Sequence, residues 1–181
     1  MAKIIKFGNV LCSSGPDVQR ETEKERANGR TGCVAKEGVC SSLRVFALRC
    51  GPGQELLSSL QAFVEERQLK APFIITCVGS VTRATLRLAN ATASNTNEVI
   101  QLQERFEIVS LVGTLNREAH LHICLADKEG KTIGGHVLGD LEVFTTAEVV
   151  IGEATDLHFT REMDSRTGFP ELVVQQRPEQ T

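Results

Sequence analysis

The sequence has no excess of positive charge, no long apolar run and no hydrophobic signal segment at its start. Its formal net charge is −3, with acidic and basic residues interspersed, so it lacks the electrostatic footprint of a free-standing nucleic-acid-binding protein. No apolar run reaches the length of a membrane span, and Lys6, Gly8 and Asn9 interrupt the first apolar residues. We therefore expect an intracellular protein without a membrane partner, located in the cytoplasm or, as the alternative, in the nucleus.

Paired cysteine motifs and internal repeats are also absent. The six cysteines stand at positions 12, 33, 40, 50, 77 and 124, with no Cys-x-x-Cys pair and no regular spacing. In a reducing compartment such cysteines are mostly small buried hydrophobic residues, so we expect no disulfide bonds. No solenoid repeat is present, and 181 residues suffice for one domain with a full core but not for two.

The first 41 residues lack apolar periodicity. Within them, residues 20–26 form a run of mixed charge that has no apolar side to bury, which is typical of a solvated segment. We expect residues 1–41 to form a flexible leader, residues 42–176 to form the folded domain and residues 177–181 to form a C-terminal tail.

Hydrophobic periodicity predicts one strong helix followed by many strands. Apolar residues recur at helical spacing from Leu56 to Val64, directly after a Gly-Pro-Gly break, so a helix is expected from about Gln54 to Gln68. The expected strands cover residues 43–49, 73–78, 84–89, 99–103, 106–115, a hairpin at 119–136, 143–152, 157–162 and 172–174. This pattern indicates the α+β class, with a twisted, mostly antiparallel sheet and one main helix packed against it.

Three of the four histidines fall within residues 120–136 and predict a cluster. The segment 119–127 alternates with the period of a half-buried strand, so His120 and His122 leave the same face. The following residues read as a tight hairpin loop with Gly130 in the left-handed conformation. If that loop has three residues, counting along both strands puts His136 directly opposite His122, close enough for the three imidazoles to converge.

Three neutral imidazoles suit a zinc ion, with iron, nickel or copper as alternatives, and leave one position open for water or substrate. The competing interpretation is that two surface histidines have a third nearby by accident. Gly134 and Gly135 favour the metal hypothesis because they let a backbone or a ligand approach closely. Cys124 shares the histidine face and is a candidate fourth ligand, although packing is its expected role. His158 has no partner in the sequence and is not expected to bind metal.

Several motifs, in order along residues 43–175, resemble those of the PPC domain (plants and prokaryotes conserved domain). They are Gly51-Pro52-Gly53-Gln54-Glu55-Leu56, Gly79-Ser80-Val81, Phe106 to Thr114, His120-Leu121-His122, Gly134-Gly135-His136 and Thr167-Gly168-Phe169-Pro170-Glu171-Leu172. The resemblance implies a compact α+β domain that assembles as a homotrimer. The wider fold is similar to that of acetolactate decarboxylase, whose His-x-His and downstream His bind zinc. This similarity implies zinc at His120, His122 and His136, but it transfers no substrate.

In plants the PPC domain follows an AT-hook, an Arg-Gly-Arg-Pro core that enters the minor groove of A·T-rich DNA. The sequence contains no such core. Its nearest match, Gly29-Arg30-Thr31, lacks both the second arginine and the proline. Direct binding to nucleic acid is therefore not expected.

Two functions of different classes remain. The first is a metal-dependent enzyme acting on an unidentified small molecule, with Glu107 as general acid/base or as a partner of an imidazole and Arg49 as the contact to an anionic substrate group. For Glu107, contact across a subunit seam is the alternative role, and for Arg49 it is an exposed ion pair. The second function is a non-catalytic trimeric interaction or regulatory module that reaches DNA only through partners.

Overall fold

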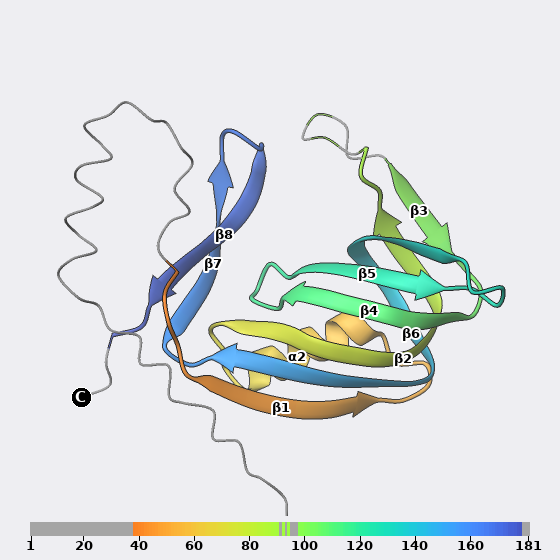
Figure 1. The fold of residues 1–181 in the computed structure, drawn as a ribbon, viewed down its shortest axis with the longest axis horizontal. Coiled ribbons are helices and arrows are strands. Elements are labelled where there is room, and N and C mark those ends of the chain that lie inside the picture. Colours follow the sequence, from red (N-terminus) through yellow and green to blue (C-terminus); the bar gives the residue numbers. More distant parts are fainter. Residues whose placement is uncertain (1–37, 91, 93, 95–97, 179–181) are drawn as a thin grey trace, which may run out of the picture. The chain divides into compact units, whose positions relative to one another are not determined.

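The computed structural model describes residues 38–90, 92, 94 and 98–178. Its elements are β1 (Leu43–Cys50), α2 (Leu56–Glu66), β2 (Pro72–Arg87), β3 (Val99–Leu102), β4 (Phe106–Thr114), β5 (His120–Ala126), β6 (Thr132–Ala154), β7 (Leu157–Asp164) and β8 (Phe169–Gln176) (Figure 1). Within these described ranges α2 is the single α-helix, and the strands pair antiparallel throughout. The predicted α+β class is confirmed.

The helix α2 begins at a side-chain cap and buries one stripe. The Glu55 carboxylate accepts hydrogen bonds from the backbone N–H groups of Leu57 and Ser58, which have no partner inside the helix. Leu56, Leu60 and Val64 recur at helical spacing and are buried, and α2 lies behind the sheet in the view of Figure 1. The periodicity thus predicts the helix, with its ends within two residues of those observed.

The main sheet closes on itself. Its order is β1-β6-β5-β4-β2-β3, and β6 also pairs with β2, so strands β2, β4, β5 and β6 form a continuous ring of hydrogen-bonded neighbours. The inward-facing side chains of this ring are almost all aliphatic and buried, among them Leu86, Leu111, Leu121, Leu125 and Leu141. A ring removes most free strand edges and encloses the core without a second layer.

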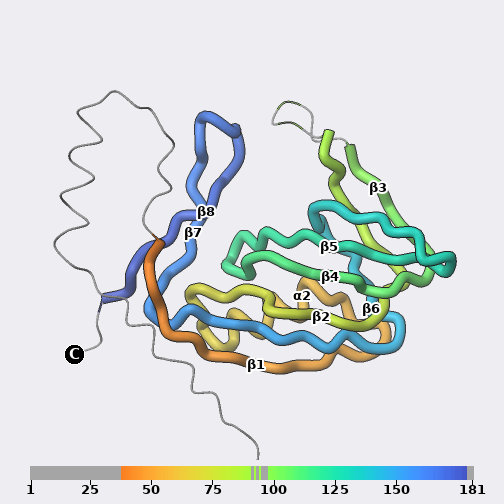
Figure 2. Tube along the Cα trace, in the orientation of Figure 1, coloured from red at the N-terminus to blue at the C-terminus, as the bar shows by residue number. Residues whose placement is uncertain are grey.

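In two places where the sequence predicts two separate strands, the structure has one long strand, namely β2 and β6. The sequence predicts a break between residues 78 and 84, but β2 runs through it with shifts of register next to Gly79. A Cβ at Gly79 would lie 2.0 Å from the carbonyl oxygen of Thr146, so only glycine allows β6 to pass this close. The sequence also predicts a break near residue 140, but β6 is continuous there, and Gly139 and Asp140 both have positive φ. Figure 2 shows β2 continuing from its place beside β4 to β3.

The structure describes only the inner parts of the predicted leader and tail. Of the predicted leader, residues 1–37 lie outside the described residues, while the Ser41 hydroxyl accepts a hydrogen bond from the backbone of Asp156. Of the predicted tail, residues 179–181 lie outside, and Arg177 contacts the folded strands. The boundaries at 41 and 176 stay predictions. No helix among the described residues is long and apolar enough to cross a membrane.

Glu153 ties three segments together at the end of β6. It is 1% exposed, and its carboxylate accepts hydrogen bonds from Arg44 on β1, from Arg177 after β8 and from the backbone N–H of Lys70. Burial raises the pKa of this carboxyl, but the hydrogen bonds from Lys70, Arg177 and Arg44 outweigh burial and hold the pKa below its usual range. The pair to Arg177 fastens the end of the β7–β8 hairpin to the sheet.

We expect Glu153→Gln to lower the free energy of unfolding by about 2 kcal/mol, because the substitution removes the buried carboxylate charge that bonds Arg177 and the half-exposed Arg44. The contribution of Glu153 to stability is present above the pKa of the unfolded carboxyl and is lost as the pH falls through its lower folded value. Urea unfolding at pH 7 and pH 4 measures both effects. Glu66→Gln, at an exposed position of α2, is the control, and an equal loss in both variants would contradict the prediction.

Candidate metal centre

The hairpin between β5 and β6 has the register that the sequence predicts. The backbone N–H of Asp127 donates to the carbonyl of Lys131 at 2.9 Å, and Gly130 is left-handed with φ 76°. His122 is paired with His136 across the two strands, and the predicted register is confirmed. The loop fixes this register because its glycine allows the tight turn and the flanking strands follow it residue by residue.

The three histidines converge on one point. One ring nitrogen from each of His120, His122 and His136 lies within 4.8 Å of the others, and the Nε2 atoms of His120 and His122 are 3.2 Å apart. Nitrogens bound to one tetrahedral zinc ion lie about 3.4 Å apart, so small rotations of the rings bring this set to metal geometry. No other cysteine, histidine or carboxylate joins the group within the described part of the chain.

Two glycines let neighbouring strands approach His136. A Cβ at Gly134 would lie 2.5 Å from the carbonyl oxygen of Ile123, and one at Gly135 would lie 2.6 Å from that of Arg87. Both contacts are with backbone, which cannot swing aside. The close approach of a backbone predicted at this pair is confirmed, and it brings β2 and β5 to either side of His136.

Burial and neighbouring positive charge favour the neutral form of His120 and His136 by lowering their pKa values. Burial, followed by the charge of Arg87, lowers the pKa of His136 to about 4. Burial and the charge of Arg161 also lower the pKa of His120. The buried Nδ1 of His136 has no hydrogen-bond partner among the described residues. Neutral imidazole is the form that binds metal ions, and a buried nitrogen without a partner is costly unless a ligand satisfies it.

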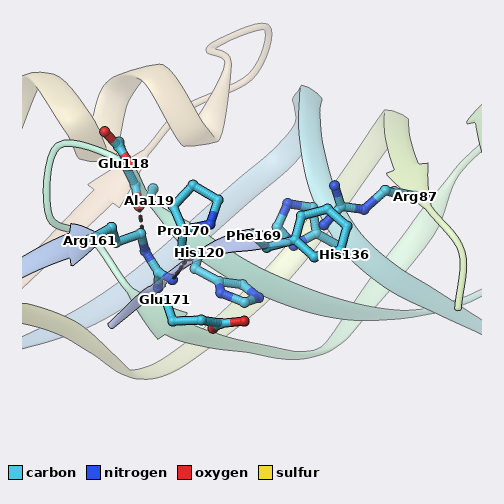
Figure 3. Close-up of a pocket in the computed structure, with 9 residues that line it drawn as sticks. All are labelled: Arg87, Glu118, Ala119, His120, His136, Arg161, Phe169, Pro170 and Glu171. Atoms are coloured by element: carbon cyan, nitrogen blue, oxygen red, sulfur yellow. Dashed lines mark hydrogen bonds between the residues drawn. The ribbon is translucent and has the colours of Figure 1, made fainter. Parts of the chain in front are cut away.

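A cavity of about 270 Å³ adjoins the histidines (Figure 3). Its walls are formed by Arg87, Glu118, Ala119, His120, His136, Arg161, Phe169, Pro170 and Glu171. The residues after 160 come from the β7–β8 hairpin, which therefore forms one side of the cavity. Arg161 holds this side in place by donating hydrogen bonds to the carbonyls of Glu118 and Pro170 and to the hydroxyl of Thr114.

The structure does not bring Glu107 or Arg49 to the histidines. Glu107 is exposed and paired with Ala126, four residues from His122 along β5, or about 13 Å. The Arg49 side chain donates to the hydroxyl of Thr146 on the far part of β6. Within one chain neither residue joins the histidine cluster. The sequence could not show this, because motif membership and strand ends do not say which end of the sheet a residue occupies. A catalytic role for Glu107 or Arg49 stays a prediction.

The charged residues that do line the cavity are Arg87, Glu118, Arg161 and Glu171, none of which the sequence analysis selected as a site residue. Arg87 pairs with His136 across β2 and β6, a register that depends on the bulges of β2. Glu171 belongs to the last of the family-like motifs, which was the one available signal. Arg161 has no motif around it.

We expect Gly135→Ala to destabilise the protein by about 1–3 kcal/mol, because the added methyl group overlaps the backbone of Arg87 and pushes β2 away from β6. Gly51→Ala is the matched control, since its Cβ would meet only the Gln54 side chain at 3.6 Å. Guanidinium unfolding measures both variants. The prediction fails if Gly135→Ala is as stable as Gly51→Ala.

Comparisons with known proteins agree with this architecture. The chain is 41% identical over 141 residues to the bifunctional protein GlmU of Synechococcus sp. (strain JA-3-3Ab), an alignment that covers 77% of this chain and 22% of that protein. The chain thus spans about a fifth of the length of this curated relative.

Two solved structures share the fold. A hypothetical protein from Salmonella cholerae-suis superposes with a TM-score of 0.72 at 39% identity, over 78% of this chain and 100% of that one. A metal-containing protein from Archaeoglobus fulgidus superposes with a TM-score of 0.64 at 25% identity, over 76% of this chain and 99% of that one.

The family comparison covers most of the folded part. The model of the Plants and Prokaryotes Conserved (PCC) domain, also abbreviated PPC, matches residues 37–155, which run from before β1 to the end of β6 and include all three clustered histidines. The resemblance that the motifs carry is therefore confirmed, and the chain belongs to the Plants and Prokaryotes Conserved domain family.

Proposed function

We propose that His120, His122 and His136 hold one divalent ion per subunit, zinc by preference, and that the protein is a metal-dependent enzyme acting on a small molecule. The observation that carries the proposal is the convergence of three imidazoles, two of them with lowered pKa values, beside a cavity. The metal content of the Archaeoglobus fulgidus relative supports it. When bound, such an ion supplies Lewis acidity and lowers the pKa of a bound water toward ~7.

The chain's own residues give the cavity a proton carrier. Glu171 is half-buried, lines the cavity and lies near His120, where its negative charge opposes the lowering of that histidine's pKa by burial and Arg161 (Figure 3). A carboxylate in this position can accept a proton from a substrate or from a bound water. We therefore assign to Glu171 the acid/base role that the sequence analysis gave to Glu107.

We expect tag-free protein to bind one zinc ion per subunit and His122→Ala to abolish this binding, because two imidazoles retain zinc poorly. Metal analysis of the purified protein after dialysis against zinc gives the stoichiometry. His158→Ala is the control, since His158 lies on β7 outside the cluster and its loss should leave zinc content unchanged. Absence of stoichiometric zinc in the unaltered protein would reject the metal site.

The homotrimer implied by the family resemblance is part of the proposal. Several valines on the strands of the main sheet are about half exposed, namely Val45, Val78, Val109 and Val112. Val112 pairs with His122, so the two side chains share a face of the sheet. Packing of a second copy on this face would bury the valines and bring the subunit boundary next to the histidines. The exposed Glu107 fits the seam role that was its alternative.

We expect sedimentation equilibrium at micromolar concentration to give three times the 19.8 kDa of one chain. Val78→Lys should shift the mass toward one chain, because it introduces a charge into the apolar face. Met163→Lys is the control, as Met163 is 69% exposed on the β7–β8 hairpin. A trimer in both variants would exclude this face as the interface, and a monomer in the unaltered protein would reject the trimer.

The same exposed valines favour the alternative function, a non-catalytic interaction or regulatory module that associates with DNA only through partners. A module of this kind does not need stoichiometric zinc or an accessible cavity beside it. Metal analysis therefore separates the two functions before any substrate is known.

A further inference from the structure

We infer that the cavity beside the histidines binds a small oxyanion, a carboxylate or a phosphate group, which Arg87 and Arg161 hold while another oxygen of the same molecule faces the three imidazoles. The inference rests on the proposed function and names its substrate class. Three features support it: neither arginine has a carboxylate partner, the charges around the cavity favour an anion, and the cavity is small.

Arg87 is held in place without a charge partner. Its guanidinium carbon lies 5.3 Å from the centre of the Phe169 ring, a cation–π contact (Figure 3). In the described part of the chain it makes no ion pair within 4.0 Å. Arg87 lines the cavity beside His136, and a cation–π contact leaves its N–H groups free to donate to a ligand.

Arg161 is rigid and equally uncompensated. Three of its N–H groups bond the carbonyl of Glu118, the carbonyl of Pro170 and the hydroxyl of Thr114, which are all neutral acceptors. A guanidinium has five N–H donors, so two stay available for a ligand. No carboxylate of the described residues lies within ion-pair distance of it. Each guanidinium on this cavity thus has N–H groups that can donate to a carboxylate or a phosphate.

The charge balance favours an anion over a neutral or cationic ligand. Glu171 and the exposed Glu118 are the acidic residues at the cavity, and neither neutralises an arginine by direct contact. A bound divalent ion would add two further positive charges while the imidazoles stay neutral. The remaining positive charge is then most simply matched by a ligand with at least one negative charge.

The cavity volume restricts the ligand to a small molecule. At about 270 Å³ it lies just below the usual range for ligand sites, about 300–1,000 Å³. Arg161, Phe169 and Glu171 lie beyond residue 155, where the family match ends. The β7–β8 hairpin therefore supplies half of the anion site and the carboxylate, whereas the matched segment supplies the histidines and Arg87.

The test uses calorimetry on the full chain at pH 8. Zinc is titrated first, and the zinc-loaded protein is then titrated with glycolate, with its neutral counterpart glycolamide and with inorganic phosphate. We expect glycolate or phosphate to bind at least tenfold more tightly than glycolamide. The stronger of the two anions identifies the group as carboxylate or phosphate. Equal affinity for glycolate and glycolamide, with no binding of phosphate, overturns the inference.

Variants attribute the binding to the arginines. Arg87→Gln should weaken anion binding about tenfold or more. Arg83→Gln is the matched control, an exposed arginine on the same strand that faces Glu142, and it should bind the anion normally. Arg161→Lys keeps the charge but loses the fork and should also weaken binding. Equal affinities in Arg87→Gln and Arg83→Gln overturn the inference.

Failure of the proposed function is a separate outcome. If the unaltered protein binds no zinc, the metal site is rejected, and the anion titrations are repeated on the metal-free protein. If Arg87→Gln then weakens anion binding and Arg83→Gln does not, the result supports the anion site without the metal site. Absence of such binding overturns the inference together with the metal site.

Discussion

The pairing of β6 with three other strands is the constraint on which both the fold and the site depend. The C-terminal part of β6 lies between β1 and β2, and its N-terminal end lies between β5 and β2. His136 stands near one end of this strand and the buried Glu153 at the other. A slip of one residue would turn both side chains to the opposite face, so the register that closes the core also assembles the histidines.

The electrostatics of the site follow from the same packing. Burial lowers the pKa values of His136 and His120 first, and the charges of Arg87 and Arg161 lower them further. The two arginines retain this effect because no carboxylate within ion-pair distance neutralises them in the described part of the chain. One arrangement thus favours the neutral form of His136 and His120 and leaves the positive charges of Arg87 and Arg161 uncompensated beside them.

Sequence reasoning succeeded where the controlling interactions are local. The helix α2 follows from apolar residues that recur at helical spacing over a few turns. The pairing of His122 with His136 follows from one tight loop at Gly130. It could not place Glu107 and Arg49, which lie away from the histidines within one chain, because this required knowing which part of the ring each strand end reaches. The gaps expected between residues 78 and 84 and between residues 136 and 143 show the same limit, since β2 and β6 run through them with shifted register and positive φ at Gly79 and Gly139.

The sequence by itself determined the α+β class, the single main helix, the histidine hairpin and the family, because each depends on residue type and on spacings of a few positions. Only the tertiary structure decided that Arg87, Arg161 and Glu171 share a cavity with His136. These residues come from β2, β7, β8 and β6, and they meet through long-range strand pairing and the docking of the β7–β8 hairpin. Contacts of that kind depend on how bulged strands bend and close, which no local pattern of side chains encodes.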